Sequence, residues 1–356
     1  MINRNNPMYG RCVKNNNLSS SLGLSIDEAL CESASKGESS PALHLYNYAP
    51  CVIIGRYQNA AACLRLDRCE ARGIEVNRRI TGGGAVFMTP DQIAFGLVLP
   101  NDFPGLPGTI HGAFEFLASA FARALSEFDL EAEFMGKNDL TVNGRKIAGL
   151  AISQDREGVT FFHTSLLLDF DLETMLDILN LPTQRLLDRG ISCFGERMTT
   201  IRKETNKEID LETVIDAVHH GIEQELKIEL FPSDLSNEEK KRVQDLCREK
   251  YENDDWIYAI RAPKRRTAFA ERKTPGGLIQ VHLALSGGAI ESLMITGDYF
   301  SRTRDIVKLE SLLKWTPAKI SVIHQRLAQS GAETFIHKVD LPTILDLIVQ
   351  IARQSD

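Results

Sequence analysis

The stretch Lys137-Asn138-Asp139-Leu140-Thr141-Val142-Asn143-Gly144-Arg145-Lys146-Ile147-Ala148-Gly149-Leu150-Ala151-Ile152 decides the fold class of this chain. The Asn-Gly pair in its middle favours a hairpin, because both residue types tolerate positive φ. The runs 139–142 and 146–152 are therefore predicted to be paired antiparallel strands. A second turn at 155–158 leads to a strand over 159–170, so three consecutive strands are expected to form a meander.

Helices and strands are predicted to alternate before this meander. Ser25 and Glu28 have the spacing of a capping box, which predicts a helix from there to Lys36. Apolar residues recur at three- and four-residue spacing between Gly112 and Glu127, which predicts one buried helix face. Extended runs are predicted at 42–48, 51–57, 74–80 and 92–99, and a further helix at 60–72.

The chain after the meander is predicted to contain a domain boundary. Helices are expected near 172–179 and 210–226, and the highly charged stretch 232–252 then carries a helix over 237–250. Strands at 256–260, 277–285 and 289–296 and helices at 306–314 and 341–353 follow. We therefore predict an α+β protein. Residues 1–234 form a large domain with a mixed or antiparallel sheet and flanking helices, and residues 235–356 form a small α+β domain with its linker helix.

Composition narrows the class of protein. The 356 residues are enough for two domains, and a net charge of −7 gives no reason to expect a nucleic-acid partner. The N-terminus is polar, and no stretch approaches the roughly 20 apolar residues that span a bilayer. We therefore expect a cytoplasmic protein without a membrane partner. Its seven scattered cysteines contain no CxxC pair, so neither a disulfide framework nor a zinc cluster is predicted.

The first candidate for a functional site is the segment Arg78-Arg79-Ile80-Thr81-Gly82-Gly83-Gly84-Ala85-Val86. Glycines let backbone N–H groups converge on an oxyanion, and arginine offers paired donors to phosphate or carboxylate. The pattern predicts an anion site, although a glycine-rich turn with surface arginines is the alternative. It matches neither the Walker motif nor GxGxxG.

The second candidate is Lys146, just after the predicted hairpin turn, with Asp139 on the opposite strand. An ammonium group near a phosphate neutralises the charge that develops there and holds the reacting oxygens in position. A nearby aspartate could hold Mg²⁺ or orient the lysine. A solvated surface lysine is the alternative reading.

Together these segments resemble the lipoate-protein ligase A family, which belongs to the biotin and lipoate cofactor-transferase superfamily. The resemblance covers nearly the whole chain and implies a catalytic domain similar to class II biotin and lipoyl synthetases. The motifs that carry it are VIIGRYQN (52–59), RRITGGGAVF (78–87), KNDLTV (137–142), GRKIAG (144–149), FHTSLLL (162–168) and RGISCFGERMTTI (189–201).

The resemblance implies a reaction in two steps that uses ATP, Mg²⁺ and lipoate. ATP and lipoate give lipoyl-AMP and pyrophosphate, and a lysine of a lipoyl domain then displaces AMP. The implied acceptor partners are E2 subunits of 2-oxoacid dehydrogenases and the H-like protein of glycine cleavage. A protein nucleophile is not needed, because AMP is already a good leaving group.

The resemblance also implies residue roles. Lys146 would contact the carboxyl oxygen and the α-phosphate, and Asp139 would help place Mg²⁺ or the adenylate. The 190–199 loop would fold over the nucleotide. The residues expected to bind lipoate or the adenylate are Arg78, Arg79, Thr81, Gly82, Gly83, Gly84, Asn138, Lys146, Gly149, His163 and Arg197.

Four positions depart from the family pattern. Met88 replaces a common histidine, Gln92 a common asparagine, Thr164 a usual glycine and Gly195 a frequent arginine. The first three are expected near the acyl and phosphate ends, so they put the preferred acid in doubt, with octanoate as one alternative. They also put reliance on the first half-reaction in doubt.

Other functions are open at this point. An octanoyl or lipoyl transferase could use a cysteine thioester at Cys193 instead of ATP, although Ser192 and Phe194 break the Pro-Cys-Gly pattern of that class. A relative that transfers preformed lipoyl-AMP would share all these residues, and a non-catalytic lipoate-binding protein is a third alternative. Biotin ligation is disfavoured, because the Gly-Arg-Gly-rich loop of those enzymes is missing.

Overall fold

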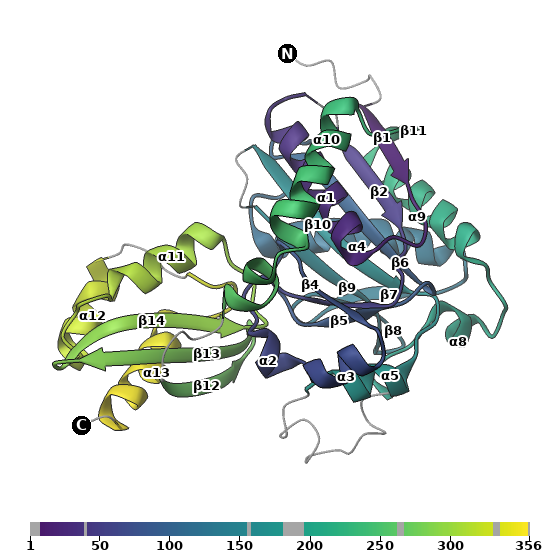
Figure 1. Ribbon diagram of the computed structural model, residues 1–356. Coiled ribbons are helices and arrows are strands. Elements are labelled where there is room, and N and C mark those ends of the chain that lie inside the picture. Colours follow the sequence, from purple (N-terminus) through teal and green to yellow (C-terminus); the bar gives the residue numbers. More distant parts are fainter. Residues whose placement is uncertain are drawn as a thin grey trace. The chain divides into compact units, whose positions relative to one another are not determined.

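The computed structural model of the protein describes residues 8–38, 41–154, 158–180, 196–261, 267–329 and 335–354 (Figure 1). The chain packs into two units. Unit 1 contains residues 1–53, 64–77 and 86–253, and unit 2 contains residues 54–63, 78–85 and 254–356. Residues 78–85 of the predicted anion segment therefore fall in unit 2, whereas the predicted meander falls in unit 1.

Unit 1 is built on an eight-stranded mixed sheet. In spatial order its strands are β11 (Ile228–Pro232), β1 (Met8–Lys14), β2 (Ala42–Tyr46), β6 (Gln92–Pro100), β10 (Val159–Leu167), β9 (Arg145–Ser153), β8 (Asp139–Val142) and β7 (Ala132–Met135). Strand β1 is parallel to both of its neighbours, and the pairs from β2 to β7 are antiparallel. The predicted meander is confirmed as β8, β9 and β10, and Asn143 and Gly144 have φ of 51° and 71° in its first turn.

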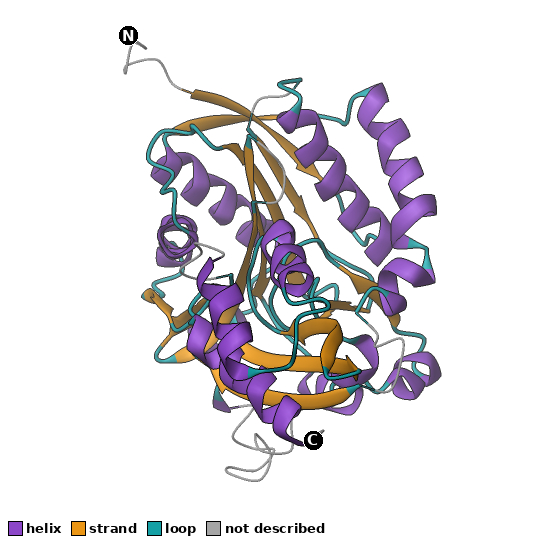
Figure 2. Cartoon of the chain, turned by 90° about the vertical axis from the view of Figure 1, so that its left-hand side faces the viewer, coloured by secondary structure: helices purple, strands orange, loops and turns teal. Residues whose placement is uncertain are grey.

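Helices lie on both sides of this sheet (Figure 2). Helix α1 (Ser20–Ser35) packs on β2, β6 and β10, and α10 (Asn237–Leu246) packs against α1. Helix α4 (Ile110–Ser126) contacts β7 and β9, and α9 (Leu211–Leu226) packs behind it. The predicted apolar face of α4 is confirmed, because Phe114, Leu117 and Phe121 are buried. Helix α10, predicted to be the linker helix of the C-terminal domain, packs within unit 1.

The predicted start of the first helix was wrong. Ser19 is its N-cap and accepts a hydrogen bond from the backbone of Leu22, so α1 begins at Ser20. Ser25 and Glu28 lie inside the helix and are buried. The two side chains have other partners. Ser25 Oγ accepts from Cys247 Sγ, and Glu28 accepts from Lys250 and Tyr251, so their spacing does not form a capping box.

The other elements before residue 254 are short. A three-stranded sheet has the order β4 (Glu75–Arg78), β3 (Cys51–Ile54) and β5 (Val86–Met88). The helix predicted over 60–72 is divided into α2 (Ala60–Cys63) and α3 (Leu66–Ala71), and Gly73 ends it with φ of 65°. Helices α5 (Leu172–Ile178) and α8 (Ile201–Thr205) flank a segment outside the described residues, and the π-helix η1 (Cys247–Tyr251) follows α10.

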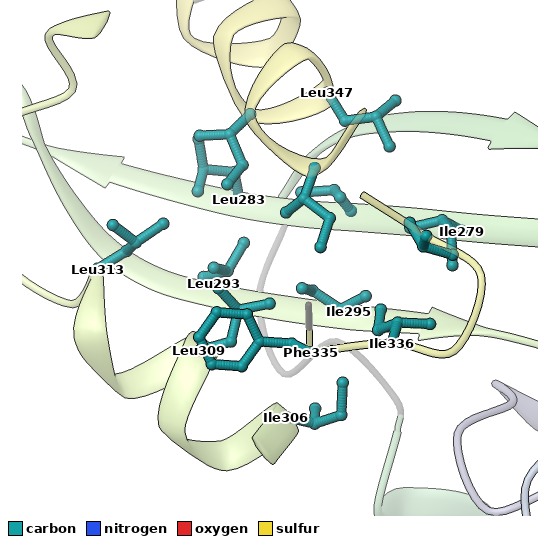
Figure 3. Close-up of a cluster of buried hydrophobic side chains, with 14 of the residues drawn as sticks. Ile279, Leu283, Leu293, Ile295, Ile306, Leu309, Leu313, Phe335, Ile336 and Leu347 are labelled. Carbon is teal, nitrogen blue, oxygen red and sulfur yellow. The ribbon is translucent and has the colours of Figure 1, made fainter. Parts of the chain in front are cut away.

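Unit 2 has its own core on an antiparallel sheet. This sheet contains β12 (Ala268–Thr274), β13 (Gly277–Ser286) and β14 (Ala289–Gly297), and the helices are α11 (Thr303–Leu312), α12 (Ile320–Gln329) and α13 (Leu341–Gln354). Figure 3 shows how strand and helix side chains meet there, among them Leu283, Leu293, Ile295, Leu309 and Leu347. One prediction was wrong, because residues 255–259 form the π-helix η2 (Asp255–Ala259) rather than a strand.

The predicted α+β class, with a large mixed sheet flanked by helices and a separate C-terminal α+β part, is confirmed. Across the described ranges, no helix combines the length and the apolarity that crossing a membrane requires.

Candidate active site

Lys146 and Asp139 form an ion pair near the β8–β9 turn. Lys146 Nζ lies 2.6 Å from Asp139 Oδ1, and the two side chains are 35% and 40% exposed. Asp139 is the first residue of β8 and pairs across the sheet with Gly149 of β9. The pair is therefore held by two strands and remains accessible to solutes. This arrangement supports the prediction that the two residues act together.

The ammonium group of Lys146 lies over a glycine. A Cβ at Gly149 would be 3.2 Å from Lys146 Nζ, so the missing side chain leaves the space that the ammonium group occupies. Side chains of paired residues point to the same face of a sheet. Two rows of residues share the face of Gly149: Gly149, Ser165 and Ala94 in one, and Ala151, His163 and Gly96 in the next.

Most of these six residues have small side chains, so little side-chain volume stands above the sheet next to Lys146. The two rows are two residues apart, or about 6.6 Å along a strand. Helix α1 covers the second row, because a Cβ at Gly96 would overlap the carboxylate of Asp27. The face therefore begins at an exposed cation and ends at buried groups beneath α1.

The backbone N–H and carbonyl of Lys146 are both held by the segment 197–199. Pairing of β9 with β10 stops at Ala148, so β10 does not reach Lys146. Instead, the N–H of Lys146 donates to Arg197 O and its carbonyl accepts from the N–H of Thr199, both at 2.8 Å. Arg197, predicted to lie in the adenylate loop, thus meets Lys146 through its backbone, and its side chain is exposed.

Asn138 has a structural partner in this sheet. Its amide Nδ2 donates to Leu150 O at 2.6 Å, and its own carbonyl accepts from the N–H of Leu150. These bonds continue the β8–β9 ladder by one residue beyond Asp139. Asn138 therefore fixes the position of Asp139, and its predicted contact with the adenylate stays a prediction.

His163 belongs to a buried polar cluster that sequence reasoning missed. Tyr46 Oη lies 2.8 Å from Asp27 Oδ2, 3.0 Å from Tyr48 Oη and 3.1 Å from His163 Nε2. Asp27 Oδ1 is in turn 2.8 Å from Nδ1 of His44. All five residues are at most 8% exposed. His44 and Tyr46 lie on one face of β2, and Tyr48 follows two residues later; this period of two was the available signal.

Charge explains the protonation pattern of this cluster. Tyr46 donates its only proton to the Asp27 carboxylate, so it accepts hydrogen bonds from Tyr48 and from Nε2–H of His163. Burial, reinforced by the negative charge of Asp27, raises the pKa of Tyr46 well above its ordinary value. The phenol therefore stays protonated, and His163 is fixed as the tautomer that carries hydrogen on Nε2.

The glycine segment of unit 2 forms a compact loop around Arg79. Arg79 is 5% exposed, and its guanidinium donates to the carbonyls of Gly82 and Gly84, both at 2.8 Å, and to Thr81 Oγ1 at 3.0 Å. Gly83 has φ of 95°, and its N–H donates to Tyr299 O. Arg79 thus stabilises the loop from within, and the predicted anion contact of these residues stays a prediction.

Arg78 is fully buried and binds carbonyl groups. Its donors reach the carbonyls of Gly55, Arg56 and Gln58 on one segment and of Trp256 and Ile257 on another. Burial lowers the pKa of Arg78 to about 9, which leaves it charged at neutral pH. Arg78 therefore has a structural role, because its buried charge is paired with backbone acceptors that belong to two segments. Contact of Arg78 with a ligand also stays a prediction.

Three of the four positions that depart from the family pattern are buried. Met88 is 3% exposed, and Gln92 Oε1 and Thr164 Oγ1 are buried without a hydrogen-bond partner among the described residues. Buried polar atoms without partners are uncommon in proteins. Cys193 and Gly195 lie outside the described residues. Within the described ranges, no group of three or more potential ligand side chains could hold a metal ion.

Comparison with known families decides the classification. Residues 20–223 match the model of the lipoyl protein ligase A/B catalytic domain, and residues 266–348 match that of the bacterial lipoate protein ligase C-terminus. The chain belongs to the lipoyl protein ligase A/B family. It is an enzyme of the lipoate ligase and transferase class, and the resemblance stated above is confirmed.

Two similar proteins carry different names. The chain is 28% identical to lipoate-protein ligase LplJ of Bacillus subtilis over 307 residues, which cover 86% of this chain and 90% of that protein. It is 27% identical to octanoyltransferase LipM of Brevibacillus brevis over 263 residues, which cover 67% of this chain and 95% of LipM. The family therefore includes both ligases and transferases among close relatives of this chain.

Solved structures agree with the fold. A lipoate-bound LipL1 of P. falciparum covers 97% of this chain and 99% of its own with a TM-score of 0.75, at 19% identity. The bipartite lipoate protein ligase of Thermoplasma acidophilum, described with its E2 lipoyl domain, covers 72% of this chain and 99% of its own, with a TM-score of 0.65 and 26% identity. A lipoate-protein ligase A bound with ATP covers 71% of this chain and 100% of its own, with a TM-score of 0.62 and 25% identity.

Proposed function

We propose that this protein is an ATP-dependent lipoate-protein ligase that forms an acyl-adenylate and transfers the acyl group to a lysine of a lipoyl domain. The observation that carries the proposal is the accessible Lys146–Asp139 pair at the open end of a sheet face made mostly of small residues. An extended acid could lie along the two rows of this face with its carboxylate at Lys146.

The first step joins two anions, which explains the need for a cation. A carboxylate oxygen attacks the α-phosphorus of ATP, the new O–P bond forms, and the bond to pyrophosphate breaks. Lys146 would neutralise charge on the carboxylate and the α-phosphate, and Asp139 would hold the ammonium group over Gly149. In the second step the acceptor amine attacks the acyl carbonyl, loses one proton and releases AMP.

Mg²⁺ fits this site only as a companion of the nucleotide. Mg²⁺ in nucleotide sites commonly takes one or two carboxylates together with substrate phosphates. Asp139 offers one carboxylate, already paired with Lys146, and the described residues contain no cluster of further ligands around it. Asp139 would therefore hold the metal together with the phosphates, and the metal would offset phosphate charge.

The C-terminal part favours a ligase over a transferase. The matched C-terminal model is described as that of a lipoate protein ligase, and the LplJ match extends over 86% of the chain. The LipM match covers only 67%. The acceptor is proposed to be a lipoyl domain, because a structural neighbour was described with an E2 lipoyl domain.

Pyrophosphate release tests the proposal. The protein is incubated with ATP, Mg²⁺ and lipoate, and Lys146→Ala is expected to lower the rate at least about 100-fold, which corresponds to roughly 2.7 kcal/mol of lost electrostatic stabilisation. Lys207→Ala removes an exposed lysine of the same part of unit 1 and should leave the rate unchanged. A folded wild-type protein that releases no pyrophosphate would contradict ATP-dependent ligation.

Octanoyl transfer without ATP is the second candidate, because LipM enzymes are among the relatives. It predicts modification of a lipoyl domain by octanoyl thioester in the absence of ATP, and loss of this reaction in Cys193→Ser. Addition of synthetic lipoyl-AMP separates a third case, in which only the second step is retained. Mass spectrometry of the acceptor domain reads all three reactions.

A further inference from the structure

A single buried carboxylate joins the two segments that hold the backbone of Lys146. Glu204 lies in α8, and its side chain is only 4% exposed. Glu204 Oε1 is 2.6 Å from a guanidinium nitrogen of Arg145 and accepts a short hydrogen bond from Thr199 Oγ1. Glu204 Oε2 accepts from Asn143 Nδ2 at 3.0 Å.

These three partners belong to segments next to Lys146. Asn143 belongs to the β8–β9 turn, and Arg145 directly precedes Lys146. Thr199 lies on the other side, where its N–H donates to the carbonyl of Lys146. Because β10 does not pair with β9 at this level, the segment 197–199 takes the place of a neighbouring strand.

We propose that Glu204 is a positioning residue for Lys146. This inference rests on the proposed function, in which the Lys146 ammonium group contacts the reacting acid and nucleotide. Glu204 does not touch Lys146. It connects Arg145 on β9 with Thr199 on the facing segment, so the two hydrogen bonds to the backbone of Lys146 stay formed.

The chemistry of the contact explains why one side chain is enough. Hydrogen bonds to a charged acceptor are shorter and stronger than neutral ones, and Glu204, whose side chain is 4% exposed, accepts two of them and forms an ion pair with Arg145. Helix α8 places the carboxylate, because Thr200 caps its first turn by accepting from the N–H of Lys203. Removal of the carboxylate would leave the buried hydroxyl of Thr199 without its acceptor and would free the segment from the edge of β9.

Hydrogen exchange resolved to single amides tests the positioning without any assumption about the reaction. In Glu204→Ala, the amide hydrogens of Lys146 and Thr199 are expected to exchange at least about tenfold faster, and that of Leu150, bonded to Asn138, should be unchanged. Glu208→Ala is the matched control, because Glu208 carries the same charge just beyond α8 and its side chain is 97% exposed.

Pyrophosphate release in the same variants tests the link to function. Displacement of Lys146 should lower kcat at least about tenfold and change KM for ATP and lipoate by less than about twofold, because the ammonium group acts on charge that develops in the reaction. Glu204→Gln keeps the length of the side chain and one acceptor oxygen, and should therefore recover part of kcat. If Glu204→Ala instead lowered the fraction of folded protein, kcat would fall with that fraction, and amide exchange would become faster throughout the protein, including at Leu150.

The outcomes separate the two proposals. Unchanged exchange at Lys146 overturns the positioning role, whatever the activity. Faster exchange with wild-type kcat also overturns it, whereas faster exchange with lowered kcat supports it. If the wild-type protein releases no pyrophosphate, the proposed function fails, and exchange alone decides whether Glu204 positions Lys146. If Glu204→Ala does not fold, Thr199→Val removes one arm of the contact and undergoes the same two measurements.

Discussion

Replacing Gly149 by alanine should lower activity without unfolding the protein. The added Cβ would lie 3.2 Å from Lys146 Nζ, which is closer than an ordinary van der Waals contact. It would lie 3.4 Å from Lys146 Cε, which is at the lower limit of such a contact. The ammonium group must therefore move by a few tenths of an ångström from its place 2.6 Å from Asp139. A shift of about 1 Å in a catalytic group can cost about 100-fold, so we expect about a tenfold loss of pyrophosphate release.

Stability should change little in the same variant. Ion pairs as exposed as Lys146–Asp139 contribute about 0–1 kcal/mol, and Gly149 does not have a left-handed φ that alanine would strain. A glycine-to-alanine change without strain stabilises a protein by about 0.4–1 kcal/mol through the unfolded chain. The two effects nearly cancel, so urea unfolding should give a free energy within about 1 kcal/mol of wild type.

A second glycine provides the control for this experiment. Gly108 is exposed, has no left-handed φ, and has no atom within 4 Å of the position of an added Cβ. Gly108→Ala should therefore keep full activity. Wild-type activity in folded Gly149→Ala would refute the reasoning, because the ammonium group would then not need its place over Gly149.

Two further predictions concern buried groups of unit 1. Tyr46→Phe removes the donor to Asp27 and the acceptor for His163, so the free energy of unfolding should fall by about 1–3 kcal/mol, whereas Tyr9→Phe, at an exposed ring, should have no effect; equal stabilities would contradict the assigned cluster. Burial alone would raise the pKa of Glu239, but hydrogen bonds from Arg11 and the backbone of Ser236 hold it below its ordinary value. A lowered folded pKa stabilises the protein above the unfolded value of about 4.3, and this stability is lost as pH falls through the folded pKa. Glu239→Gln should therefore be less stable than the wild type at pH 7 and lose less stability below about pH 4.3 in urea unfolding. If the free energies of unfolding of the two proteins change with pH in parallel, Glu239 does not have the lowered pKa.

Local patterns predicted most of the sheet in unit 1. The Asn143-Gly144 turn and the alternating runs around it are sufficient to place β8, β9 and β10, because turn geometry sets register between strands close in sequence. The boundaries of α1 and the π-helix η2 could not be obtained in this way. Ser19 rather than Ser25 caps α1, and the choice depends on burial of residues 23–31 against the sheet.

The candidate site was predicted unevenly for a physical reason. Lys146, Asp139 and Gly149 lie within eleven residues of one another, so the hairpin alone brings them together. Glu204 and Thr199 are more than fifty residues away from Lys146, and no local pattern relates them to it. Their contact with the lysine strand appears only once α8 is packed beside the end of β9.

Residue types and spacing by themselves therefore determined the meander and the position of Lys146 beside Asp139, and the resemblance of six motifs indicated the family. Tertiary structure decided which groups each buried cation contacts. Arg78 and Arg79 donate to backbone carbonyls, because a buried cation needs hydrogen-bond acceptors, and the anion contact predicted for them from the sequence stays a prediction. Tertiary structure also assembled Asp27, Tyr46 and His163 from three separate elements, because only packing of α1 on the sheet brings them within hydrogen-bonding distance.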